Sequence, residues 1–198
     1  MIRFKHLPFI AVVFFAFSAS GQESEHPGRN FQKGRYIVGL NGTGGFNNNS
    51  HFRHPIWSLS PWAGYFVAPN LATGLRMSYG KDAIEVKRGN TGSIPEHRYH
   101  SLAPEVFIRY YTPRVKIKPF VQVSAGYNFQ WGESENTPGQ MTKVKASNAV
   151  GSVEGGIRFP IAKRFSLDAA YNWRAFSKST LNDVNEKGTW RLGMSFSW

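Results

Sequence analysis

Strict alternation of apolar and polar residues constrains this chain more than any other feature. In the segment PFVQVSAGYNFQW, every second residue from Val121 to Trp131 is apolar, and the residues between them are Gln, Ser, Gly or Asn. A period of two is that of a β-strand whose two faces meet different environments. An alternating stretch of about 11 residues has the length with which a tilted strand crosses a bilayer.

The same alternation recurs along the chain, and no amphipathic helix of useful length interrupts it. Eight strands are predicted, in or around residues 36–43, 56–67, 71–79, 101–110, 121–131, 152–159, 165–174 and 190–198. In the second of these, Trp62 and Phe66 fall on the face opposite Leu59, Tyr65 and Val67. A bulge near Pro61 would repair that register, because bulges shift the side-chain phase by one residue.

The connections between the predicted strands alternate in length. Short turns are expected at Ala68–Asn70, Thr112–Lys116 and Pro160–Arg164. Longer polar loops are expected at Asn47–Pro55, Gly80–Arg98, Gly132–Lys145 and Ser177–Lys187. Short and long connections that alternate around an even number of antiparallel strands are typical of transmembrane barrels. The predicted fold is all-β, a closed eight-stranded antiparallel transmembrane β-barrel.

The residues on the polar face favour a membrane barrel over a soluble barrel or sandwich. A soluble sheet would present Lys, Glu and Thr to water on that face, whereas here it carries mainly Gly, Ser, Asn, Gln and Ala. Small residues suit the crowded interior of a narrow tube. The large aromatic residues also gather near the strand ends, at the depth of two membrane interfaces.

The first residues have the pattern of an export signal. A basic start is followed by the apolar run from Leu7 to Phe17 and by small residues up to Gly21. We therefore predict a cleaved signal peptide at 1–21, a flexible periplasmic lead-in at 22–33 and the barrel at 34–198. Cleavage removes Arg3 and Lys5 and lowers by two the formal net charge of +12. An exported basic chain without a clustered basic stripe indicates anionic lipid head groups as partners, and not nucleic acid.

Charged residues on the inward face are expected to form a network that closes the tube. This network comprises Arg76, Glu105, Arg109, Glu154, Arg158, Asp168, Arg174 and Arg191. An unpaired charge in a narrow tube is costly, so we expect Arg76 to pair with Glu105 and Arg158 to pair with Asp168. Glu154 is expected to serve a second arginine.

The two remaining arginines, Arg174 and Arg191, are expected to draw on the loop carboxylates Asp183 or Glu186.

Outside the tube, basic residues of the outer loops are placed where phosphates of lipopolysaccharide would meet them. These residues are Lys81, Lys87, Arg88, Lys143 and Lys145.

Two motifs invite a binding function that their context does not support. GLNGTGG lacks the Lys-Ser/Thr ending of a phosphate-binding loop. His51 and His54, and then His97 and His100, form two HxxH pairs in or beside predicted loops. Several histidines can converge on a metal, but no carboxylate is clearly placed beside these four. We therefore interpret them as loop histidines and predict no metal and no cofactor.

The hairpin GYFVAPNLATGLRMSY (Gly64–Tyr79) and the alternating C-terminal strand resemble the small eight-stranded outer-membrane β-barrel proteins of Gram-negative bacteria, of the OmpA-barrel and OmpX type. The resemblance spans residues 34–198 and implies integral localisation in the outer membrane. It also implies that Phe196 and Trp198 form the signal read by the barrel assembly machinery and part of the aromatic girdle.

The resemblance leaves three functions open. A non-enzymatic structural or surface-interaction role is the main prediction, and a narrow small-solute channel of porin type is the alternative. A lipid A-modifying enzyme is the third. A deacylase of this fold would need a His-x-Ser on a late strand, but YNWRAFSKS (Tyr171–Ser179) contains no histidine, so no catalytic residue is predicted. The ligand, the conductance and the oligomeric state are left undetermined.

Overall fold

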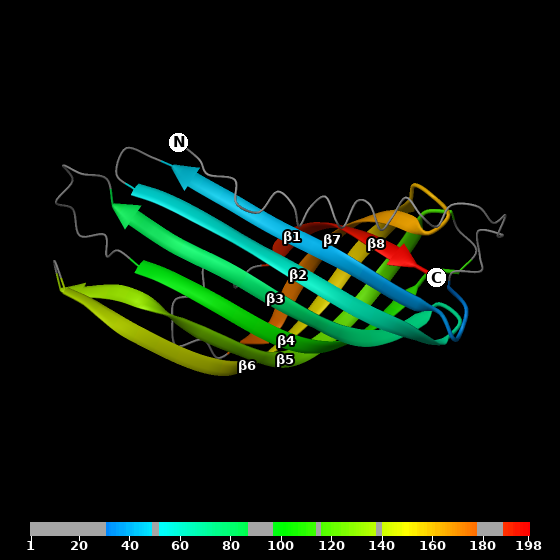
Figure 1. Ribbon diagram of the computed structural model, residues 1–198, viewed down its shortest axis with the longest axis horizontal. Helices are drawn as coiled ribbons and strands as arrows, with labels where there is room; N and C mark the ends of the chain where they lie inside the picture. The colour runs from blue at the N-terminus through cyan, green and yellow to red at the C-terminus, as the bar shows by residue number, and fades with distance from the viewer. Residues whose placement is uncertain (1–30, 49–51, 87–96, 114–115, 138–139, 178–187) are drawn as a thin grey trace.

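The structure is a computed structural model that describes residues 31–48, 52–86, 97–113, 116–137, 140–177 and 188–198. Its eight strands are β1 (Tyr36–Asn48), β2 (Phe52–Ala68), β3 (Leu71–Val86), β4 (His97–Tyr111), β5 (Lys118–Thr137), β6 (Gln140–Pro160), β7 (Phe165–Ser177) and β8 (Thr189–Ser197). Each strand pairs antiparallel with the next, and β8 returns to β1 with a register from Ile37↔Ser197 to Gly42↔Leu192 (Figure 1). The predicted closed barrel is confirmed. None of the helical segments in these residues has the length and apolar character needed to span a membrane.

The apolar faces of the strands point outward, as predicted. Leu75 is 65% exposed and Leu192 is 68% exposed, whereas Arg76 and Glu154 are buried inside the barrel. This distribution is the reverse of that in a water-soluble protein, where apolar side chains lie inside. It suits a surface that contacts hydrocarbon.

The register of β2 corrects one prediction. The β2–β3 pairing keeps one register from Phe52↔Val86 to Phe66↔Ala72 and shifts only between Phe66 and Ala68. The predicted bulge near Pro61 is therefore wrong. Trp62 and Phe66 lie on the inward face and are buried in the core of the barrel. The strand therefore reaches this arrangement without a bulge.

The strands also run farther than predicted, beyond the apolar band. β3 continues to Val86 and β4 begins at His97, inside the predicted loop Gly80–Arg98. β5 and β6, of 20 and 21 residues, occupy nearly all of the predicted loop Gly132–Lys145. They project at the end opposite the short turns (Figure 1). Beyond the bilayer both faces of a hairpin meet water, so the apolar alternation stops although the hydrogen-bond ladder continues.

We call the end of the barrel with the three short connections the turn end and the opposite end the loop end. At the turn end, Asn70 adopts φ 62° between β2 and β3, a left-handed conformation that asparagine tolerates. Its backbone N–H donates to the carbonyl of Phe31 (2.8 Å). Phe31 is 8% exposed, so residues 31–33 of the predicted flexible lead-in are part of the folded barrel. Residues 22–30 and the predicted signal peptide lie outside the described residues.

Buried aromatic rings, together with three aliphatic side chains, form the hydrophobic core at the turn end. This core comprises Phe31, Ile37, Trp62, Phe66, Ala72, Phe107, Tyr111, Phe120 and Ala170. Phe31 contacts Tyr111 and Phe66 edge-on, with ring centroids 4.9 Å and 5.6 Å apart. The core therefore fills the turn end of the barrel interior, below the charged groups.

Candidate functional site

A network of buried charges occupies the middle of the barrel. Arg76 of β3 donates hydrogen bonds to Glu105 of β4 (2.5 Å) and to Glu154 of β6 (2.9 Å). Because β3 and β6 are not neighbours, the bond from Arg76 to Glu154 crosses the lumen. Ser124 of β5 accepts from Arg76 (3.0 Å) and donates to Glu105 (2.7 Å). The predicted pair of Arg76 and Glu105 is present.

Glu154 binds three arginines from three different strands. Besides Arg76, its carboxylate lies 3.3 Å from Nη1 of Arg191 and 3.4 Å from Nη2 of Arg109. The sequence predicted that Glu154 serves a second arginine, and the structure places three arginines around it. One buried carboxylate thereby compensates charge from β3, β4 and β8, which holds distant parts of the wall together.

The two predicted arginines at the rim have different surroundings. Arg191 was expected to draw on Asp183 or Glu186, but it reaches Glu154, and both loop carboxylates lie outside the described residues. Arg174 of β7 lines the space above the network. The sequence did not anticipate that Arg191 extends toward the middle of the tube, because strand position alone does not fix the direction of a long side chain.

Arg109 and Arg158 connect the network to the aromatic core. The guanidinium carbon of Arg109 lies 4.4 Å from the ring centroid of Trp62 and 4.3 Å from that of Phe120. Such cation–π contacts offset part of the cost of desolvating a charge. Asp168 lies 3.8 Å from Arg158 and 3.7 Å from Arg109, so the predicted pair of Arg158 and Asp168 is also present.

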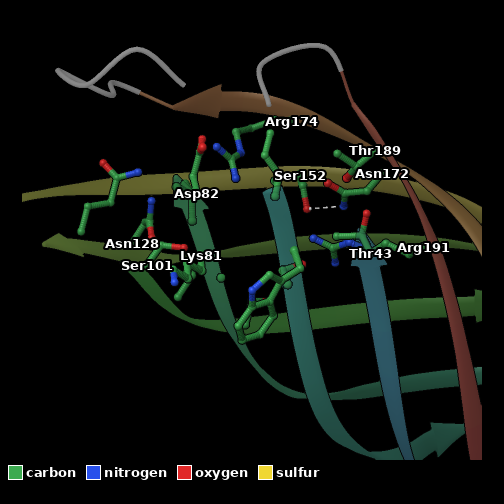
Figure 2. A pocket seen from close by; sticks show the side chains of 18 of the residues that line it. Thr43, Lys81, Asp82, Ser101, Asn128, Ser152, Asn172, Arg174, Thr189 and Arg191 are labelled. Atoms are coloured by element: carbon green, nitrogen blue, oxygen red, sulfur yellow. Dashed lines mark hydrogen bonds between the residues drawn. The ribbon is translucent and has the colours of Figure 1, made fainter. Parts of the chain in front are cut away.

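Above the network, the lumen opens into a cavity of about 370 Å³ toward the loop end. Figure 2 shows its polar wall, to which Asn128 of β5, Asn172 and Arg174 of β7, and Arg191 of β8 contribute. Asn172 donates a hydrogen bond to Ser152 of the neighbouring strand β6 (3.0 Å), and both residues line the cavity. The barrel interior is thus aromatic at the turn end, charged in the middle, and polar around the cavity toward the loop end.

The histidines of the two HxxH pairs lie in different places. His54 of β2 and His97 of β4 both approach Asp82 of β3, with Nε2–Oδ1 distances of 2.7 Å and 3.6 Å. His100 lies on the outward face, 2.8 Å from the hydroxyl of Tyr79, and His51 is outside the described residues. The interpretation of His54 and His97 as loop histidines is wrong, because both are in strands.

Sequence reasoning missed the carboxylate of this cluster. Asp82 continues the inward-facing series of Arg76, Ser78 and Gly80. The apolar residues of the outward face end at Tyr79, so the alternation in the sequence is no longer visible beyond it. Extension of the same period by two residues would have placed Asp82 on the inner wall.

On the outward face, a row of paired residues crosses four strands at the loop end. Lys81 pairs with His100, His100 with Trp131, and Trp131 with Lys145. The rings of His100 and Trp131 stack with centroids 5.9 Å apart. We call these four residues the rim row. Of the other predicted contacts with lipopolysaccharide, Lys143 is exposed on β6, and Lys87 and Arg88 are outside the described residues.

The C-terminal residues lie at the turn end, beside the start of β1. Trp198 is 40% exposed, and its ring centroid lies 5.6 Å from that of Phe196 and 6.0 Å from that of Tyr36. These rings, with Tyr65 packed 5.1 Å from Tyr36, form an outward aromatic patch. The patch has the position of an interfacial girdle.

Known structures share this architecture. The structure of Neisserial surface protein A aligns over 83% of this chain and 97% of its own, with 14% identity and a TM-score of 0.52. The structure of the outer-membrane protein OprG from Pseudomonas aeruginosa aligns over 88% of this chain and 99% of its own, with 12% identity and a TM-score of 0.57. At these identities the likeness shows the fold alone. By sequence, no curated protein matches the chain.

The family described as "Outer membrane protein beta-barrel domain" matches residues 9–197. This match covers nearly the whole sequence and agrees with the closed ring of eight strands and its apolar outer surface. The chain therefore belongs to the outer-membrane β-barrel family.

Proposed function

We propose that this protein is a non-conducting, non-enzymatic barrel that acts at the cell surface, where its rim row contacts lipopolysaccharide. The rim row is the observation that carries the proposal. Lys81 and Lys145 flank the stacked rings of His100 and Trp131. Three strand spacings separate the two lysines, a distance of about 14 Å along the row.

The chemistry of the rim row suits an anionic amphiphile. Lysine ammonium groups attract phosphates, and aromatic rings settle at the depth of lipid head groups. Within the described part of the chain, neither Lys81 nor Lys145 has a carboxylate partner. Their charges are consequently available to an external anion.

Binding of fluorescent lipopolysaccharide to the protein in nanodiscs tests the proposal. The variant Lys81→Ala/Lys145→Ala should bind roughly thirtyfold more weakly, since each of the two basic residues near an anionic surface contributes about 1 kcal/mol. The matched control is Lys116→Ala/Lys163→Ala, which removes two exposed lysines at the turn end. The loss should shrink as salt screens the charges. Equal weakening in both variants, or affinity independent of salt, would contradict the proposal.

A channel is the second candidate, and the cavity of about 370 Å³ at the loop end is the observation that favours it. We expect it to be a dead end, because the Arg76–Glu154 bond crosses the lumen beneath it and the aromatic core lies below that bond. Planar bilayers containing the wild-type protein should therefore show no stable single-channel current. Steady currents would establish the channel and overturn the proposal that the lumen is closed.

The absence of enzymatic activity is tested separately. Lipid A extracted from cells that express the protein should have the same acyl chains as lipid A from control cells. A gain or loss of acyl chains by mass spectrometry would replace the binding role with a lipid A-modifying activity.

A further inference from the structure

Three strands bring two histidines and one carboxylate together on the inner wall of the loop end. Asp82 of β3 pairs with Ile56 of β2 and with Tyr99 of β4. His54 and His97 each lie two residues closer to the loop end than these partners. They are thus diagonal neighbours of Asp82, a separation that long side chains bridge.

The donor atoms converge more closely than a surface histidine pair requires. Both Nε2 atoms point at the same oxygen, Oδ1 of Asp82, at 2.7 Å and 3.6 Å, and the three donor atoms lie within 4.8 Å of one another. Donors around a tetrahedral zinc ion, at Zn–N distances near 2.1 Å, are separated by about 3.4 Å. Small side-chain rotations would bring His54, Asp82 and His97 to that separation.

The surroundings of the cluster hold the ligands and leave one side open. The side chains of His54, His97 and Asp82 are only 11%, 16% and 23% exposed. The ring of Tyr99 stacks on that of His97 with centroids 4.8 Å apart, which restricts the orientation of the imidazole. Asp82 also lines the cavity described above. A fourth ligand, such as water, can therefore approach from the cavity.

We propose that His54, Asp82 and His97 form a binding site for a divalent transition-metal ion of the zinc class, with an open coordination position toward the cavity. Two imidazole nitrogens and one carboxylate oxygen suit Zn²⁺ and similar first-row ions. Ca²⁺ and Mg²⁺ require sets of oxygen ligands and are not expected to bind. A bound ion would link β2, β3 and β4 at their outer ends, and the site is independent of lipopolysaccharide binding.

Calorimetric titration of the folded protein with Zn²⁺, in detergent free of chelators, tests the site directly. Wild type should bind one ion per chain, and Zn²⁺ should raise its melting temperature. His54→Ala and Asp82→Asn should each weaken binding at least roughly a hundredfold, because the first removes one of three ligands and the second replaces the charged carboxylate with a neutral amide. His100→Ala is the matched control, because it removes a histidine from the same region that faces outward; it should bind as wild type does.

Two further measurements separate metal ligation from a structural role of the His–Asp contacts. Heat-modifiable migration on gels shows whether each variant is folded, and only folded variants are compared. Substitution with Co²⁺ should give the visible absorption of a four-coordinate ion in wild type and His100→Ala, and none in Asp82→Asn. Absence of Zn²⁺ binding to wild type, or equal binding to folded wild type and His54→Ala, would overturn the proposal.

Discussion

Tyr36 and Trp198 exchange two backbone hydrogen bonds, from Tyr36 N–H to the Trp198 carbonyl (3.0 Å) and from Trp198 N–H to the Tyr36 carbonyl (3.1 Å). The last residue of the chain is thus paired with the first residue of β1, at the seam that closes the barrel. A chain end is usually frayed unless it is tied down. Here the backbone pairing and the packed rings of Tyr36 and Trp198 fix the end in place.

Replacement of the last residue should affect assembly more than stability. Trp198→Ala keeps the two backbone bonds and should lower the free energy of unfolding by about 1–2 kcal/mol, through lost ring contacts. Its yield in the outer membrane should fall much further, since we propose that the barrel assembly machinery reads Trp198. The matched control is Tyr36→Ala, which removes the partner ring but leaves the C-terminus intact. Equal yields of the two variants would show that Trp198 is no assembly signal.

Removal of one partner from the charge network should cost more than removal of both. Glu105→Ala leaves Arg76 with Glu154 alone, a carboxylate that it shares with Arg109 and Arg191. The buried cluster then carries excess positive charge, and we expect a loss of about 3 kcal/mol in unfolding free energy. In Arg76→Leu/Glu105→Ala, Glu154 still has Arg109 and Arg191, so the loss should be smaller. Urea unfolding in lipid vesicles measures both. A double variant less stable than Glu105→Ala would contradict this account of the pair.

Phe31 should contribute to stability although it precedes the first strand. Phe31→Ala removes a ring that packs on Phe66 and Tyr111, and large-to-small changes of this kind cost about 3 kcal/mol. The matched control is Phe159→Ala on the outward face, where the ring is 40% exposed and less packing is lost. Similar unfolding midpoints for the two variants would show that the lead-in does not seal the turn end.

Labelling of single cysteines should establish the orientation in the membrane. The chain has no cysteine, so Thr142→Cys at the loop end and Thr112→Cys at the turn end each introduce one reactive thiol. Because short turns are periplasmic in barrels of this family, a membrane-impermeant maleimide should label intact cells that carry Thr142→Cys. It should label Thr112→Cys only after the cells are opened. The opposite pattern would reverse the topology.

Alternation was sufficient to predict the part of the barrel that contacts lipid. From Val121 to Trp131 and from Trp190 to Trp198, every second residue lies on the outward face. The sequence records this face directly because the bilayer imposes one environment on it. The same logic failed beyond the membrane. Val86 and Gln140 are still in strands, but water on both sides leaves no apolar pattern to follow.

The pairs within the lumen were predictable where a partner lies on the next strand at the same height. Arg76 and Glu105 are direct cross-strand partners, as are Arg158 and Asp168, and position along the strand was enough to find them. Contacts across the tube were not predictable in this way. The bond between Arg76 and Glu154 depends on the curvature that brings β3 opposite β6, which no local pattern encodes.

The sequence by itself therefore determined the number of strands, their faces and the closed barrel, because each of these follows from a period of two and from the lengths of connections. Only the tertiary structure decided where side chains from distant strands meet. Phe31 enters the core because Asn70 and Phe66 bind its segment. His54 and His97 reach Asp82 because the register of three strands sets them side by side. Register is a property of the paired sheet, and it turns residues far apart in sequence into one site.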